Sequence, residues 1–509
     1  MKKLLLSFVI LLIAGKIVAQ ESQLPAFVVD SLESYISRGM TKWRIPAVSC
    51  AIVKDGKVIF VKGFGVTDLQ SKQKVNEHTL FMIGSNTKAF TTTTLAILQE
   101  EGKLSLNDRV QKWMPEFRLK DTLASNNVTI ADLLSNHIGF ETFQGDFTYW
   151  TSNLSRAEVI HRMALIDAPY SFRSKYGYCN AAFLTAGELI PRIIGKTWEE
   201  TVKEKILQPL QMERTLLLAR EFKGSTNKTL PYTMVDDNLW EMPIPDLDNL
   251  ASAASMSSSA SDMAIWLQAQ LNTGKLSNSQ KIPEKAFLTI RKPQTIISAD
   301  GREKQRSHFQ LYGLGLRMMD RNNRIVYSHS GAVDGFLSMV MFVPEDKLGI
   351  VVMTNTDKNS FYQSLSYEIL DAFLGLPYKG YSDITYASNV MDEAKTKSRL
   401  DSLRNVIKLN KRLPLPMKDY AGVYKDAVYG TIEVKQEKGS LNIYFSHHPA
   451  LIGKLEYINN NVFLCTYSNP LMGVEEIPFK MEANRIVGLT LRVDDFLEFT
   501  SYEFVKVQN

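Results

Sequence analysis

Hydrophobic and polar positions near the start of the chain follow first a helical and then a strand period. The spacing predicts an amphipathic helix over residues 26–40 and two strands over residues 47–53 and 57–64, with Asp55 and Gly56 between the strands. Asp-Gly between two alternating runs is a strong signal for a tight hairpin. Over residues 110–240 the pattern indicates mostly helices and loops, with helical segments at 130–134, 158–164 and 181–194.

Strand patterns return after residue 310. Alternating or continuously apolar runs predict strands over residues 312–318, 324–329, 336–343 and 349–354, followed by a helix over residues 361–374. The Ser- and Ala-rich stretch at 252–262 predicts a loop that ends in the cap of a helix over residues 263–271. Because strands come from both ends of this region with helices between them, the sequence predicts an α+β domain with an inserted helical lobe.

A second domain, built only of strands, is predicted at the C-terminal end. Residues 378–413 are charged and contain a predicted helix over 391–409, which ends before Pro414 and Pro416. Residues 420–507 consist of short alternating runs, such as 430–435, 440–445, 462–467 and 497–505. This spacing predicts a small antiparallel barrel or sandwich. We therefore divide the chain into a leader at 1–20, a first domain at 21–377, a linker with a helix at 378–413 and a barrel-like domain at 414–509.

The first twenty residues have the pattern of a signal peptide. Lys2 and Lys3 precede an apolar run at residues 4–14, and the small residue Ala19 follows it. The run is too short to span a bilayer comfortably. We expect export to the periplasm or the medium, with no stable membrane span once the leader is removed. An uncleaved N-terminal anchor is the alternative, because Lys16 follows the apolar core.

Composition and charge narrow the classes of function. The chain has 509 residues, 45% of them hydrophobic, which is enough for two domains with their own cores. The net charge of +5 is small for this length and indicates neither nucleic-acid binding nor a strongly basic membrane-binding surface. The three cysteines are scattered and odd in number, and the seven histidines show no metal-ligand spacing. We expect free thiols, no metal and no cofactor.

The stretch around Ser85 holds the first candidate for catalysis. Ser85 and Lys88 lie at the start of a predicted helix that stops at Gly102, with Ser85 as a candidate cap of its first amides. Residues three apart share one face of a helix, so the Lys88 amine is expected beside the Ser85 hydroxyl. A partly buried lysine with a lowered pKa can take the proton of a serine and make it a nucleophile. For so short a motif the alternative is a cap plus a surface lysine, and Ser71 with Lys74 repeats the spacing in a polar run.

Two further segments place polar residues beside predicted elements. Tyr178 and Asn180 come immediately before a helix, where the phenol could relay protons and the amide could orient a carbonyl; packing and helix capping are the alternatives. His329, Gly331 and Ala332 lie between two predicted strands. A glycine on a strand edge lets a substrate backbone lie alongside, and the Ala332 amide could donate to an oxyanion. The alternative for His329 is a hydrogen-bonded turn residue.

The order of the three motifs along the chain, and the predicted elements beside them, distinguish them from isolated spacings that occur by chance. The first opens a helix at Ser85, the second precedes another helix at Tyr178, and the third lies beside strands at His329. The set resembles the serine β-lactamase and penicillin-binding protein superfamily, in the branch that holds class C β-lactamases, D,D-peptidases, D-aminopeptidases and related esterases. The resemblance covers about residues 25–375 and includes LLSNHIGF at 133–140 and YGLG at 312–315. It implies a β-lactamase/transpeptidase-like domain, an antiparallel sheet flanked by helices, with the active site between the sheet and a helical lobe. The C-terminal strands resemble the lipocalin-like barrel appended to some members.

The resemblance also implies a role for each motif residue. Ser85 would be the acylated nucleophile, and Lys88 with Tyr178 the pair that transfers protons. Asn180 would orient the substrate amide. The main-chain amides of Ser85 and Ala332 would form the oxyanion hole.

Two departures from the family pattern bear on the substrate. His329, which together with Gly331 would contact the substrate, stands where β-lactamases usually have lysine, and Ile138 stands where relatives often have serine. Histidine is mostly neutral at pH 7. We therefore expect weak β-lactamase activity, better turnover of uncharged esters or amides, and an affinity for carboxylates that rises as the pH falls through the pKa of His329.

Together these observations predict an exported serine hydrolase that cleaves amide or ester bonds in a small molecule or peptide, with cell-wall peptides as one candidate. The alternatives are a true β-lactamase, a D,D-carboxypeptidase, or a penicillin-binding sensor that is acylated without turnover. A Ser-His-Asp hydrolase of the α/β type would need a Gly-x-Ser-x-Gly elbow, which the sequence lacks. Because all three motifs precede Pro414, the first domain is expected to be acylated without the second. The barrel could instead cover the cleft and restrict substrates.

Overall fold

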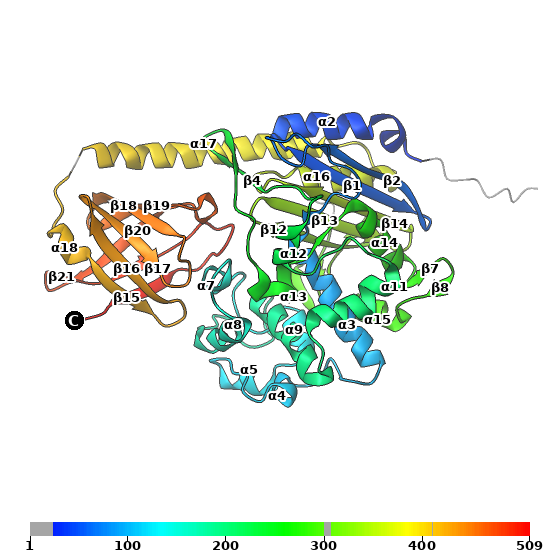
Figure 1. Ribbon diagram of the computed structural model, residues 1–509, viewed down its shortest axis with the longest axis horizontal. Helices are drawn as coiled ribbons and strands as arrows, with labels where there is room; N and C mark the ends of the chain where they lie inside the picture. Colours follow the sequence, from blue (N-terminus) through cyan, green and yellow to red (C-terminus); the bar gives the residue numbers. More distant parts are fainter. Residues whose placement is uncertain (1–23, 300–306, 410, 509) are drawn as a thin grey trace, which may run out of the picture.

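The computed structural model shows two domains joined by one long helix, α17 (Figure 1). It describes residues 24–299, 307–409 and 411–508, so the predicted signal peptide lies outside the described residues. The first domain contains the main sheet and most of the helices, and the second is a β-barrel. In the part of the chain described, no helix combines the length and the apolar character that crossing a bilayer requires.

An eight-stranded antiparallel sheet forms the centre of the first domain. Its strand order is β2-β1-β14-β13-β12-β11-β10-β9, so the N-terminal hairpin lies beside the last strand of the domain. The strands are β1 (Ala47–Lys54), β2 (Lys57–Gly65), β9 (Thr295–Ser298), β10 (Gln310–Tyr312), β11 (Arg317–Arg321), β12 (Arg324–Val333), β13 (Phe336–Val343) and β14 (Leu348–Thr354). The predicted hairpin and the α+β class are confirmed.

Helices cover both faces of this sheet (Figure 1). On one face lie α2 (Leu32–Trp43), which follows a π-helical turn at Phe27–Ser31, and α16 (Phe361–Phe373). On the other face lies α14 (Ala260–Leu271). Strands β13 and β14 are buried along their whole length. Burial on both faces explains why their sequences are continuous apolar runs rather than alternating ones.

Helix α3 (Thr87–Glu100) runs through the first domain and carries Lys88. A short 3₁₀ turn, η2 (Gly84–Asn86), precedes it. The threonines at 91–94 are poor helix formers, but all four are fully buried, and their hydroxyls donate to main-chain carbonyls of residues 89, 90 and 252. Burial therefore holds this run in the helix.

The helical lobe follows η2 and α3 in the sequence, and its longest helix is α9 (Asn180–Ile194). Its other helices are short: α4 (Val110–Trp113), α5 (Thr122–Asn127), α6 (Ile130–Leu134), α7 (Asp146–Tyr149), α8 (Arg156–Arg162), α10 (Trp198–Val202), α11 (Gln208–Leu210), α12 (Ala219–Gly224), α13 (Ala251–Ala254) and α15 (Glu284–Ile290). Two-stranded pairs connect them: β3 (Phe81–Met82) with β6 (Ser257–Ser258), β4 (Tyr232–Val235) with β5 (Asn238–Glu241), and β7 (Lys275–Leu276) with β8 (Ser279–Gln280).

The prediction of a loop over residues 252–262 is wrong. This stretch contains the end of α13, the strand β6 and the start of α14, and residues 251–260 are all buried. Its small side chains allow a close approach to α9: a Cβ atom at Gly187 would lie 2.3 Å from the Ser252 hydroxyl oxygen. The Ser- and Ala-rich composition therefore reflects tight packing and not an exposed connection.

Two predicted boundaries are also wrong. Residues 312–318 are not one strand, because β10 ends at Tyr312 and β11 begins at Arg317, and the connection between them passes close to α3. The linker helix α17 (Tyr381–Lys408) starts ten residues before the predicted 391. Contacts with the first domain hold this early part: the Tyr381 hydroxyl donates to Asp371, and the Trp43 indole donates to the Ser382 hydroxyl.

The second domain is a closed antiparallel barrel in which each strand pairs with the next and β22 pairs with β15. Its strands are β15 (Gly422–Asp426), β16 (Gly430–Glu437), β17 (Ser440–Phe445), β18 (Ile452–Asn459), β19 (Val462–Tyr467), β20 (Val474–Glu482), β21 (Arg485–Leu491) and β22 (Tyr502–Lys506), preceded by the short helix α18 (Met417–Tyr420). The barrel alternative is thus confirmed. The predicted strand over 497–505 is wrong in its first half, because β22 begins only at Tyr502 and the preceding residues form a loop.

Candidate active site

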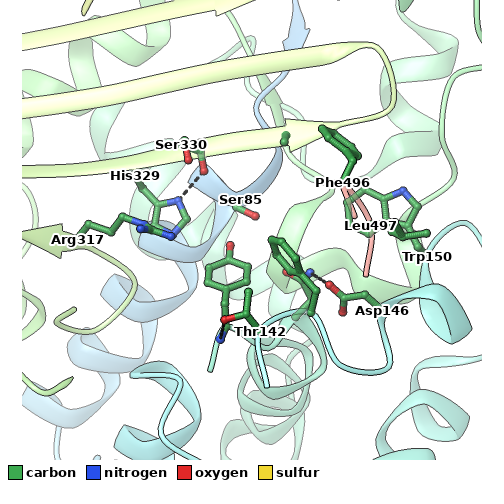
Figure 2. Close-up of a pocket in the computed structure, with 13 residues that line it drawn as sticks. Ser85, Thr142, Asp146, Trp150, Arg317, His329, Ser330, Phe496 and Leu497 are labelled. Carbon is green, nitrogen blue, oxygen red and sulfur yellow. Dashed lines mark hydrogen bonds between the residues drawn. The ribbon is translucent and has the colours of Figure 1, made fainter. Parts of the chain in front are cut away.

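Ser85 lies in the turn η2, at a pocket of about 120 Å³ between the sheet, the helical lobe and the barrel (Figure 2). Besides Ser85, the pocket is lined by Thr142, Phe143, Asp146, Trp150, Tyr178 and Asn180 from the lobe, Arg317, His329, Ser330 and Ala332 from the sheet, and Phe496 and Leu497 from the barrel domain. Neither η2 nor α3 has a side-chain cap. The prediction that Ser85 caps the helix is therefore wrong, and its side chain belongs to the pocket.

The Lys88 amine lies directly beside the Ser85 hydroxyl, with 3.0 Å between Nζ and Oγ. Nζ also donates to Asn180 Oδ1 at 2.6 Å and to the Ala253 carbonyl at 3.0 Å. The side chain is fully buried, and this burial lowers the pKa of Lys88 to about 7, against a smaller opposing effect from Asp146. A buried amine with this pKa is neutral in part at physiological pH, so it can accept a proton.

Asn180 connects Lys88 to a carboxyl group that the sequence analysis did not single out. Its Oδ1 accepts from Lys88, and its Nδ2 donates to Asp146 Oδ2 at 2.6 Å. Asp146 is buried at the start of α7, and its Oδ1 has no hydrogen-bond partner among the described residues. Burial raises the pKa of Asp146 well above its ordinary range, and the charge of Glu498 adds to this effect. Asn180 is thus held between two ionisable groups and does not cap α9, which has no side-chain cap.

Tyr178 also lies close to the Lys88 amine, which is 4.6 Å from the centre of its ring. Burial raises the pKa of the Tyr178 phenol far above its ordinary value, and a hydrogen bond with Ser85 only partly opposes this. The phenol therefore keeps its proton at neutral pH and is suited to donate a proton rather than to accept one.

His329 lies within strand β12, not in a turn. Pairing with β11 ends at Ser328, whereas pairing with β13 continues to Val333, so residues 329–333 form a local strand edge beside the pocket. Nδ1 of His329 lies 2.6 Å from the Ser330 carbonyl, which can only accept, so Nδ1 carries the hydrogen. Nε2 then accepts from the Tyr312 hydroxyl at 3.0 Å.

Both ring nitrogens of His329 are thus bound to the protein. Burial, followed by the charges of Lys88 and Arg317, lowers the pKa of His329 well below its ordinary value. The imidazole is therefore neutral at pH 7, as predicted. The expected rise in carboxylate affinity through the pKa of His329 is not supported, because that pKa lies well below the range assumed.

Gly331 has a packing role that the sequence analysis did not predict. It does not line the pocket, and a Cβ atom at this position would lie 1.9 Å from the Ile83 carbonyl oxygen. Across the same contact, a Cβ at Gly84 would lie 2.8 Å from the Ala332 nitrogen. The two glycines therefore let η2 and β12 approach closely, which brings the main chain of Ala332 next to the turn that carries Ser85.

Arg317 brings a permanent positive charge to the pocket. It is the first residue of β11 and lies beside His329 in Figure 2. Its Nε is buried without a hydrogen-bond partner among the residues described. Arg317 lies in no recognisable sequence motif, so the sequence did not indicate its place in the pocket. The pocket nevertheless contains a cation close to the place where β-lactamases usually have lysine.

The family segment at 133–140 holds the Tyr178 turn in place. Asn136, fully buried, accepts the Cys179 amide with its Oδ1 at 3.0 Å and the Gly177 amide with its carbonyl at 3.0 Å.

The three cysteines are buried and free, as expected. Within the described ranges, no three His, Cys, Asp or Glu residues gather in a way that could hold a metal ion.

Comparison with known proteins defines the class of the chain. Residues 32–373 match the Beta-lactamase family, and residues 408–506 match a domain of unknown function, DUF3471. The first match covers almost the whole first domain. The chain therefore belongs to the Beta-lactamase family, in the serine β-lactamase and penicillin-binding protein superfamily, which confirms the resemblance drawn from the motifs.

Three similar proteins come from different organisms. Protein flp of Staphylococcus aureus (strain MW2) is 27% identical over 371 residues, which cover 71% of this chain and 69% of that protein. The unguisins hydrolase ungD of Aspergillus violaceofuscus is 25% identical and covers 79% of this chain and 76% of its own length. The solved structure of the octameric penicillin-binding protein homologue from Pyrococcus abyssi aligns with a TM-score of 0.61 at 22% identity, over 94% of this chain and all of that one. This likeness confirms the fold.

Proposed function

We propose that this protein is an exported serine hydrolase that cleaves amide or ester bonds through an acyl-enzyme on Ser85. Its substrates are small molecules or peptides, and cell-wall peptides are one candidate class. Export rests on the leader-like pattern of residues 1–20. Membership of the Beta-lactamase family and the similarity to a fungal hydrolase support the reaction class.

The observation that carries this proposal is the buried amine of Lys88, 3.0 Å from the Ser85 hydroxyl and with its pKa lowered to about 7. At pH 7 about half of such amines are neutral, which provides a base in contact with the nucleophile. A surface lysine would be fully protonated. Ser71 and Lys74, which repeat the spacing, are both exposed.

In the proposed acylation, Lys88 accepts the Ser85 proton as the hydroxyl oxygen forms a bond to the substrate carbonyl carbon. The amides of Ser85 and Ala332 stabilise the resulting oxyanion. When the bond to the leaving amine or alcohol breaks, the neutral Tyr178 phenol gives it a proton, and Lys88 returns a proton to the phenol. The bond from Asn180 to Asp146 uses one hydrogen of the amide NH₂ group, and the second serves the substrate.

The proposal is tested by mass spectrometry of the full chain after exposure to a penicillin, a chromogenic ester and a D-amino-acid amide. We expect an adduct on Ser85 and steady turnover of the ester. A single stoichiometric burst with a lasting adduct would assign the protein to the acylated sensors instead. An adduct on another residue, or none with any of the three probes, would contradict the proposal.

The pH dependence of hydrolysis is expected to follow Lys88. Because its pKa is lowered to about 7, the amine is protonated below this pH and neutral above it. For an uncharged ester, kcat/KM should therefore rise with pH and level off above about pH 7. A profile that continues to rise toward about pH 10, the range of an ordinary lysine, would show that the group acting as base does not have a pKa lowered to about 7.

Arg317 is expected to favour substrates that carry a carboxylate near the scissile bond. Arg317→Gln removes the charge, and we expect kcat/KM for a carboxylate-bearing ester to fall roughly tenfold or more, as for a lost charge-assisted hydrogen bond. The matched neutral ester should change by less than about twofold. Arg324→Gln, which removes an arginine paired with Asp346 outside the pocket, is the control. Equal effects of Arg317→Gln on both esters would assign Arg317 to structure and restore the preference for uncharged substrates.

A further inference from the structure

Part of the helical lobe is held by the barrel domain. Phe147, on α7, is fully buried against the aromatic residues of the barrel. Its ring centre lies 5.1 Å from that of Tyr429, 5.0 Å from His448, 5.9 Å from Phe445 and 5.8 Å from Tyr502. Figure 1 shows α7 next to the barrel. A side chain of the first domain thus completes the core of the second.

A second contact fixes the start of the same helix. Glu498, in the loop before β22, accepts the Gly145 amide at 2.8 Å and the Phe147 amide at 2.9 Å. Its carboxylate also accepts from the Tyr502 hydroxyl at 2.8 Å, and the side chain is 1% exposed. These two amides have no partner within a helix of four residues, so a residue of the other domain supplies the acceptor for each.

The residue between these two amides is Asp146. It binds Asn180 at 2.6 Å, Asn180 binds Lys88 at 2.6 Å, and Lys88 lies 3.0 Å from the Ser85 hydroxyl. A series of hydrogen bonds therefore leads from the side chain of Asp146, whose two neighbours in the chain are held by Glu498, to the nucleophile. Because Asp146, Asn180 and Lys88 are all buried, a shift of α7 would move the Lys88 amine or leave Asn180 without a partner.

The same loop also forms one wall of the pocket. Phe496 and Leu497 face Ser85 from the side opposite His329 (Figure 2). The Asp494 side chain accepts the Phe496 amide at 2.8 Å, and its carbonyl accepts the Leu497 amide at 2.9 Å, so the loop has a defined shape. Every motif residue lies in the first domain, but the barrel domain supplies part of the pocket wall, so acylation of the first domain alone stays a prediction.

We propose that the loop at 494–499 makes the barrel domain part of the active site. Glu498 is a positioning residue for the hydrogen-bonded series Asp146–Asn180–Lys88, and Leu497 is a residue that selects substrates. The proposal rests on the proposed function for its kinetic readout. The proposed roles predict different kinetic effects for the neighbouring residues Leu497 and Glu498. Glu498 does not line the pocket and should act on kcat, whereas Leu497 lines the pocket and should act on KM.

The kinetic test uses the full chain and a small uncharged chromogenic ester. Glu498→Ala is expected to lower kcat roughly tenfold to a hundredfold, as for a small misplacement of catalytic groups, with KM changed by less than about twofold. Glu498→Gln should lose less, because its amide oxygen can still accept from a main-chain N–H. Leu497→Ala should raise KM with little change in kcat. Glu503→Gln, an exposed carboxylate of the same domain paired with Lys480, is the matched control and should leave both constants unchanged.

A second measurement does not depend on hydrolysis. Hydrogen exchange followed by mass spectrometry should show faster exchange of the peptide that contains residues 145–150 in Glu498→Ala, intermediate exchange in Glu498→Gln, and wild-type exchange in Glu503→Gln. If the Glu498→Ala chain fails to fold, Glu498→Gln decides. Wild-type kcat together with wild-type exchange in a folded Glu498 variant would overturn the proposal. Failure of the wild type to hydrolyse any probe would contradict the proposed function and leave the exchange test standing.

Discussion

Ser85→Ala is expected to abolish hydrolysis, with a fall in kcat of about 10⁴-fold or more, because the reaction loses the atom that forms the acyl bond. The fold should persist. Ser85 does not cap η2 or α3, so the substitution removes only a hydroxyl that lines the pocket. The free energy of unfolding should therefore change by less than about 1 kcal/mol. Turnover of a chromogenic ester and thermal unfolding of the same preparation measure both effects.

Ser71→Ala is the matched control for this experiment. Ser71 has the same spacing to a lysine, Lys74, but both are exposed and Ser71 bonds to Asp68. The Ser71→Ala protein should hydrolyse the ester at the wild-type rate. Activity that survives in Ser85→Ala would show that another group is the nucleophile, whatever the effect of Ser71→Ala.

Lys88→Ala is expected to lower kcat by about 10²- to 10⁴-fold, the usual contribution of a general base. Without the amine, the Ser85 hydroxyl keeps its hydrogen bond with Tyr178, whose phenol holds its own proton and is not suited to act as the base. The substitution also leaves Asn180 Oδ1 and the Ala253 carbonyl without their donor, which should destabilise the fold by about 1–3 kcal/mol. Kinetics are therefore measured well below the unfolding temperature, with Lys74→Ala, an exposed lysine, as the control.

Retention of more than about a tenth of the wild-type rate in Lys88→Ala would assign the base to Tyr178. The raised pKa of the Tyr178 phenol argues against this outcome, because a protonated phenol cannot accept the serine proton. Lys88→Ala combined with Tyr178→Phe separates the two assignments. If Tyr178 were the base, the double substitution would lose the remaining rate.

Local signals in the sequence were sufficient for several elements and for the centre of the site. The Asp55-Gly56 turn defined the first hairpin, and the continuous apolar run of β13 gave its limits at Phe336–Val343. Ser85 and Lys88 were identified because a spacing of three residues on one helix is a local property. Where the sequence prediction was wrong, as at residues 252–262, small side chains that pack tightly have the same composition as a loop.

The sequence by itself determined the order of elements, the two domains and the three motifs, because neighbouring residues encode period, turns and helix ends. Only the tertiary structure decided which other groups surround Ser85. Asp146 and Arg317 line the pocket, and Glu498 binds the main chain on either side of Asp146. The three come from separate parts of the chain and carry no motif, so nothing in their spacing indicates that they lie close together. The pKa of Lys88 likewise depends on its burial by α9 and α13, since removal from water is what lowers it. A pKa that is lowered by burial exists only in the folded protein, where distant segments of the chain surround the side chain.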